Sequence, residues 1–299
     1  MKLFSFLFIG IILITRLSAQ DEDLLKLLGK EKPKKQLIKY AFKSPRIING
    51  HSIEFLNPGT MDFRIMHNFG PLSSGVQNLY GFDQATMRMS FDFGLAKSLM
   101  FGFGRSTYKK ELDGFIKYAP IRQSTGPWSS PVTVAVVAGI TMNTLPWADT
   151  SIKNYFTSRL AYYYQVLIGR KFSEGFTFQI SPTIVHRNLV QLATDSNDVY
   201  ALGIGGRLKL SRRVAFTWDY FHLLNVLNGR APVGVTDPLS VGFDIETGGH
   251  VFQLHFSNTA GMNERAFLTE TTNNWSKFQV SFGFNLSRVF QLKHGKKKE

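Results

Sequence analysis

Charged residues that could pair with one another, or bind a small charged solute, recur along the chain at even spacing. The two members of each pair are two or four positions apart, which places both side chains on one face of a β-strand. The pairs are Asp62 with Arg64, Arg88 with Asp92, Asp113 with Lys117, Arg207 with Lys209, and Asp244 with Glu246. Mixed charge inside a protein indicates either ion pairs that fill space or a lining that selects a solute.

The histidines do not form a metal or catalytic motif. The chain has seven histidines and no cysteine, and it contains no His-Glu-x-x-His sequence. His255 and Ser257 share a predicted strand face at a separation of about 6.6 Å, whereas a proton relay needs about 3 Å. His250 and His255 lie on opposite faces. We therefore predict no cofactor, no metal site and no enzymatic activity.

The segments that carry the charges alternate apolar and polar residues with a period of two, as far as Phe290. They are ten or more residues long, whereas strands of soluble proteins average about 5–6 residues. A tilted strand needs about 9–11 residues to cross a bilayer. The pattern predicts an all-β fold, a transmembrane antiparallel β-barrel with apolar faces toward lipid and charged faces toward the lumen.

We predict about twelve strands in this barrel. They fall at 60–69, 83–95, 98–108, 111–122, 131–143, 156–170, 175–188, 199–211, 213–224, 239–247, 249–258 and 276–290. The connections largely alternate between long and short, which is typical of long external loops and short periplasmic turns. Lys109-Lys110 is too short for this rule and 123–130 is too long. An even strand count places both termini in the periplasm.

The N-terminus has the layout of a cleaved secretory signal. Lys2 precedes an apolar run from Leu3 to Ile14, and small residues come before an acidic cluster at Asp21. We predict that residues 1–20 form a signal peptide, cleaved near Ala19 and Gln20. Residues 21–50 would then be a basic periplasmic lead segment, 51–290 the barrel, and 291–299 a basic periplasmic tail.

Composition limits the class of protein and its partners. The chain of 299 residues has 35 Lys and Arg against 21 Asp and Glu, a formal net charge of +14. The lack of cysteine excludes a disulfide scaffold, and the lack of repeated apolar runs of about 20 residues excludes a helical polytopic protein. An exported chain is not expected to bind nucleic acid. We expect contact with outer-membrane lipid, and with an acidic periplasmic protein at residues 21–50; the alternative is a solvated basic segment.

Seven short motifs point to a known family. They are 42–54 (FKSPRIINGHSIE), 67–70 (HNFG), 81–88 (GFDQATMR), 102–106 (GFGRS), 113–118 (DGFIKY), 246–254 (ETGGHVFQL) and 283–290 (GFNLSRVF). Over about residues 42–290 the chain resembles an uncharacterised outer-membrane β-barrel family of Bacteroidota, a domain of unknown function. The resemblance implies a barrel and an outer-membrane address, and it implies no substrate or activity.

Two classes of function remain open from the sequence. The first is an outer-membrane channel for small solutes, in which the charged faces line the path. The second is a non-conducting barrel that serves as a membrane anchor or as a subunit of an envelope complex, in which the charges form ion pairs that fill the lumen. Conductance through the purified protein distinguishes the two.

Overall fold

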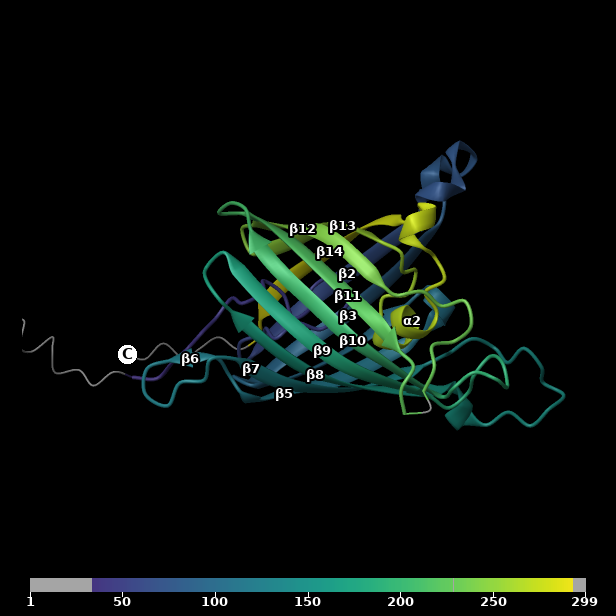
Figure 1. The fold of residues 1–299 in the computed structure, drawn as a ribbon, viewed down its shortest axis with the longest axis horizontal. Coiled ribbons are helices and arrows are strands. Elements are labelled where there is room, and N and C mark those ends of the chain that lie inside the picture. The colour runs from purple at the N-terminus through teal and green to yellow at the C-terminus, as the bar shows by residue number, and fades with distance from the viewer. Residues whose placement is uncertain (1–33, 228, 293–299) are drawn as a thin grey trace, which may run out of the picture. The chain divides into compact units, whose positions relative to one another are not determined.

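Twelve antiparallel strands close into a barrel in the computed structural model, which describes residues 34–227 and 229–292 (Figure 1). The strands are β2 (Thr60–Pro71), β3 (Ala85–Ala96), β4 (Leu99–Ser106), β5 (Leu112–Ile121), β7 (Thr133–Met142), β8 (Leu160–Lys171), β9 (Phe176–Arg187), β10 (Asp198–Lys209), β11 (Val214–Leu224), β12 (Leu239–Thr247), β13 (His250–Ser257) and β14 (Ser281–Gln291). Each pairs with the next along the chain, and β14 closes the barrel against β2. The predicted fold class and strand number are confirmed.

The remaining elements are short. They are the strands β1 (Gln36–Leu37) and β6 (Ser124–Thr125), the helix α2 (Glu264–Thr269), and the 3-10 turns η1 (Leu72–Ser74), η2 (Val76–Gly81), η3 (Tyr108–Lys110), η4 (Phe156–Arg159) and η5 (Trp275–Lys277). No helix within residues 34–227 and 229–292 has the length and apolar character to cross a bilayer. The chain divides into two units, residues 1–36 with 125–129 and residues 37–124 with 130–299, and the barrel belongs to the second.

The strand faces follow the predicted alternation. Along β2, Asp62 and Arg64 are buried, whereas Phe63 between them is partly exposed on the outer wall. The outward ring of Phe63 packs against that of Phe91 on β3, with the centroids 5.1 Å apart. Such aromatic and aliphatic rows form the lipid-facing belt of a membrane barrel, while the polar face of each strand points inward.

Long and short connections gather at opposite ends of the barrel. One end carries 72–84, 107–111, 143–159, 188–197, 225–238 and 258–280, and the other carries 97–98, 122–132, 172–175, 210–213 and 248–249. The two predicted exceptions are therefore real connections and not miscounted strands. The two-residue turn Gly248-Gly249 has φ of 46° and 98°, the positive values that a type I′ hairpin turn needs at both positions and that glycine adopts most readily. Residue 292 and the start of β2 both lie at the short-turn end.

The structure buries part of the predicted lead segment within the barrel. Residues 41–56, which we call the inner segment, lie buried inside the barrel and not in a lead segment outside it. Its apolar side chains are all buried, and Phe42, Ile48 and Ile53 are at most 3 % exposed. Removal of these apolar side chains from water stabilises the folded state. Polar side chains of the lumen wall can form hydrogen bonds with the backbone groups that are buried with them. The predicted signal peptide, residues 21–33 and residues 293–299 lie outside the described residues.

Candidate functional site

The inner segment makes a tight turn inside the lumen at Ile47–Gly50. The amide of Ile47 donates to the carbonyl of Gly50 over 2.8 Å. The next three amides, of Ile48, Asn49 and Gly50, all donate to Oδ2 of Asp219 on β11, over 3.3, 2.8 and 2.9 Å. Buried N–H groups need acceptors, and a carboxylate is the strongest one available to a turn with clustered amides. Asp219 therefore fixes the tip of the segment to the wall.

Carbonyl groups of the inner segment are bound by side chains on four wall strands. These donors are Lys117 Nζ to Ser52 (2.9 Å) and Glu54 (2.7 Å), Thr177 Oγ1 to Ala41 (2.8 Å), Gln179 Nε2 to His51 (2.7 Å), Gln253 Nε2 to Ile47 (2.6 Å) and Asn285 Nδ2 to Ile48 (3.2 Å). They come from β5, β9, β13 and β14. The polar wall face that sequence alternation places in the lumen thus serves the backbone of this segment.

A second segment enters from the long-loop end. Residues 258–271, which we call the inner loop, include α2, whose N-cap Asn263 accepts a hydrogen bond from the amide of Ala266 over 2.9 Å. Glu264, Phe267 and Leu268 of this helix are fully buried. This part of the connection from β13 to β14 is therefore folded into the barrel, whereas residues 276–278 further along it are exposed.

One aromatic ring of the wall packs against both inward segments. The ring of Phe221 on β11 lies 5.1 Å from that of Phe267, between centroids. A Cβ atom at Gly50 would lie 2.8 Å from the same ring, so the turn tip approaches Phe221 as closely as only glycine allows. The inner segment and the inner loop therefore pack as one core with the wall.

The two segments are joined by a buried ion pair in the lumen. Arg46 of the inner segment donates from Nη1 to Oε1 of Glu264 over 2.9 Å and from Nη2 to Oε2 over 3.4 Å. Both side chains have no exposed surface. His51 Nε2 lies 3.3 Å from Glu264 Oε1 and 3.2 Å from the hydroxyl of Tyr163 on β8. The lumen is closed at this level by side chains from both segments and the wall.

The charges predicted to line the lumen pair mostly across strands. Arg88 on β3 makes two hydrogen bonds to Asp113 on β5, over 2.9 and 2.5 Å. It reaches over β4 at Gly104, where a Cβ atom would lie 2.6 Å from Arg88 Nη2. Arg88 and Asp92 are four residues apart on one strand, a separation of about 13 Å that prevents direct pairing. Within-strand pairing holds for Asp62 and Arg64, at 2.8 Å.

The remaining predicted site residues take different positions. Arg207 pairs with Glu246 at 3.1 Å and lies 4.0 Å from Asp244. Lys209 is exposed at the end of β10 and lines no buried space. Asp92 is fully buried opposite Asp62, and neither of its oxygens has a hydrogen-bond partner within the described part of the chain. Lys117 binds backbone carbonyls and not Asp113.

Sequence reasoning missed the residues that close the lumen. Arg46 and His51 stand inside the motif at 42–54, for which the family resemblance implies no activity. Glu264 lies in a long connection without periodicity, and 218 positions separate it from Arg46. No group of three or more metal-ligating side chains occurs within residues 34–227 and 229–292.

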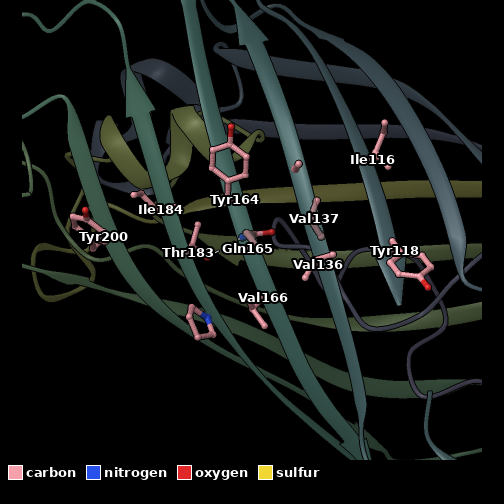
Figure 2. Close-up of a pocket in the computed structure, with 12 residues that line it drawn as sticks. Ile116, Tyr118, Val136, Val137, Tyr164, Gln165, Val166, Thr183, Ile184 and Tyr200 are labelled. Atoms are coloured by element: carbon pink, nitrogen blue, oxygen red, sulfur yellow. Dashed lines mark hydrogen bonds between the residues drawn. The ribbon is translucent and has the colours of Figure 1, made fainter. Parts of the chain in front are cut away.

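An apolar hollow of about 590 Å³ lies on the outer wall (Figure 2). Tyr118, Tyr164 and Tyr200 line it, on strands β5, β8 and β10. Pro182 of β9 also lines it. The β8–β9 register is interrupted here between Gln165–Thr183 and Ile168–Ile180, because proline has no N–H to donate to the neighbouring strand. The hollow faces lipid, so it is not part of a path through the lumen.

Most of the chain matches the model of a known protein family. Residues 42–290 match the family described as "Membrane bound beta barrel domain (DUF5777)". The chain belongs to this membrane-bound β-barrel family. No curated protein matches the chain.

Solved structures similar to this family member include the NanC porin and an outer membrane channel from Pseudomonas putida F1. The NanC porin has 11 % sequence identity and a TM-score of 0.47, over 77 % of this chain and 98 % of that one. The Pseudomonas channel has 11 % identity and a TM-score of 0.48, over 79 % and 97 %. LpxR from Salmonella typhimurium has 10 % identity and a TM-score of 0.34, over 77 % and 99 %. At these identities the likeness is limited to the barrel fold.

The family match includes both inward segments of this membrane-bound β-barrel. It begins at Phe42, the second residue of the inner segment, and ends at Phe290 in β14. The inner loop, with Glu264, lies within the same range. The matched domain is therefore the barrel together with the segments that fill it.

Proposed function

We propose that the protein is a gated outer-membrane channel for small solutes, and that the structure is its closed state. The observation that carries this proposal is the Arg46–Glu264 ion pair, which joins two segments of the chain across the lumen. In this proposal residues 1–20 are removed on export, the long loops are external, and both termini are periplasmic. The motif resemblance supports an origin in Bacteroidota, and residues 21–40 are left as the place for a periplasmic partner.

The way the inner segment is held favours a displaceable closure. Within the described residues its backbone forms no ladder with a wall strand, and the wall binds it through side-chain hydrogen bonds. Such bonds exchange with water at a net cost of about 0.5–1.5 kcal/mol each. The twelve-strand wall would thus keep its own hydrogen bonds if the segment moved, which is what a gate requires.

One observation favours the second candidate, a non-conducting barrel. Phe42, Ile53 and Phe55 of the inner segment pack in one apolar cluster with wall residues such as Phe115 and Leu167. Burial of each such side chain stabilises the closed form by about 1.5–3 kcal/mol. If the free energy of this apolar packing is too large for the segment to leave the lumen, the closure is permanent and the protein is an anchor or a subunit of an envelope complex.

Conductance in a planar bilayer distinguishes these candidates. We expect the wild-type protein to be closed most of the time, with rare discrete steps. A variant in which a Gly-Ser linker replaces residues 260–270 and both Arg46 and Glu111 are changed to Gln should show long-lived steps. The link between the segments is lost, and the two buried charges that pair with Glu264 and Arg265 are removed with it.

The matched control places the same linker in the exposed connection at 148–153, and it should behave as wild type. Circular dichroism confirms that each barrel is folded. If a folded linker variant shows no steps at any voltage, the channel proposal is contradicted and the non-conducting barrel is supported.

A further inference from the structure

A charged cavity of about 290 Å³ lies at the long-loop end, beside the inner loop. Its lining comes from the ends of β8 and β9, the adjacent connections, and α2. The charged members are Lys109, Glu111, Arg159, Arg187, Arg265 and Glu270. Four cations face two carboxylates, so the cavity has an excess of positive charge.

Both carboxylates already form ion pairs with cations of the same cavity. Glu270 accepts hydrogen bonds of 2.6 Å from Arg265 and from Lys109. Burial acts to raise the pKa of Glu270, but the hydrogen bonds and charges of these two cations outweigh it and lower the pKa to about 2. Glu111 pairs with Arg265 and accepts a 2.7 Å hydrogen bond from Asn263. Neither acid is free to neutralise further cations.

Two arginines of the cavity form no ion pair within the described part of the chain, and Asp195 and Glu270 act on one of them, Arg187, only as more distant negative charges. No carboxylate of the described residues lies within 4.0 Å of Arg159 or Arg187. Arg187 is only 5 % exposed; its Nη2 donates to the carbonyl of Ser196 over 2.6 Å, while its Nε is buried without a partner. Arg159 donates to the carbonyl of Asn143 over 3.0 Å. A buried guanidinium is costly without a counter-charge, and its flat fork of donors fits a carboxylate.

We propose that this cavity binds a small organic carboxylate, held by the guanidinium groups of Arg159 and Arg187. Its volume of about 290 Å³ is at the lower limit of about 300 Å³ for small-molecule sites, which restricts the ligand to a solute of few atoms. The bound anion would also attract Arg265, which Glu111 and Glu270 now hold. Because Arg265 belongs to α2, this competition would loosen the inner loop, so the ligand would favour the open state. That last step rests on the proposed function.

Binding is tested by calorimetric titration of the purified full chain in detergent with succinate. We expect saturable binding with one site per chain, and none with the neutral isostere succinamide. Arg187→Gln and Arg159→Gln should each weaken binding at least about tenfold, because each removes a charge-assisted contact. Arg187→Lys, which keeps the charge, should lose less. Arg212→Gln, an exposed arginine in a turn at the other end, is the matched control and should bind as wild type.

The stacking of Arg159 on Trp147, 3.9 Å from the ring centroid, supplies an independent optical readout. Succinate should change the tryptophan fluorescence of the wild type, and Trp147→Phe should abolish that change. Equal binding of succinamide, equal loss in Arg212→Gln and Arg187→Gln, or no saturable binding would overturn the site. Tighter binding of inorganic phosphate than of succinate would overturn the carboxylate assignment.

The gating step has its own readout in the planar bilayer. Succinate should increase the open fraction of the wild type and leave that of Arg187→Gln unchanged. If succinate binds and the open fraction does not change, the site stands and the coupling to α2 is wrong. If the linker variant without the Arg46–Glu264 link never conducts, the proposed function fails, whatever the binding result.

Discussion

Replacement of Glu264 by alanine should destabilise the protein by about 3–5 kcal/mol, because it leaves the guanidinium of Arg46 buried without its counter-charge. Both side chains are fully buried, and the pair joins the inner segment to the inner loop. The double variant Arg46→Met with Glu264→Met removes both charges and should recover most of this loss. Urea titration in detergent measures the free energy of unfolding for each variant and for the pair together.

The ion pair of Lys171 with the exposed Glu174 provides the control. Glu174 is 86 % exposed, so Glu174→Ala should change the free energy of unfolding by no more than about 1 kcal/mol. Equal small losses for Glu264→Ala and Glu174→Ala would mean that the lumen is hydrated and that the buried pair does not close it.

Replacement of Asp219 by alanine should cost at least about 3 kcal/mol, since three buried amides would lose their acceptor at once. These are the amides of Ile48, Asn49 and Gly50, which form the tip of the inner segment. Asp219→Asn keeps an acceptor oxygen but loses the charge, so the loss should be about half as large. Hydrogen–deuterium exchange should show faster exchange at these three amides in both variants.

Asp149 is the matched control for this prediction. It lies in an exposed connection and accepts hydrogen bonds from Ser151 only locally, so Asp149→Ala should change stability by about 0.5 kcal/mol or less. Unchanged exchange at residues 48–50 in Asp219→Ala would show that the tip is not held by this carboxylate.

The wall of the barrel could be predicted from the sequence because its signal is local. Side chains of a strand alternate with a period of two, so β2 and β14 are recognisable from their own residues. The number of strands then follows from counting, and the position of each end follows from turn residues such as Gly248-Gly249. Each of these steps uses neighbours in the chain, which is why the predicted strand ranges agree with the structure to within a few residues.

The filling of the lumen could not be predicted because its partners are distant in sequence. Asp219 is 170 positions from Asn49, and Glu264 is 218 positions from Arg46. The inner segment also lacks a regular alternation of apolar and polar residues, so its sequence predicts neither a strand nor which side chains face the wall. The cross-strand pairing of Arg88 with Asp113 depends on the register of three strands and on the space at Gly104. Alternation predicts which face a charge occupies, but it does not predict its partner.

Thiol accessibility tests most directly whether the inner segment lies inside the barrel. The chain has no cysteine, so Ser52→Cys introduces a single thiol at a fully buried position. We predict that a water-soluble maleimide reagent leaves this thiol unmodified in the folded protein and modifies it in urea. Ser151→Cys, in an exposed connection, should react at the rate of a free thiol under both conditions. Equally fast modification of both variants in the folded protein would contradict the closed lumen.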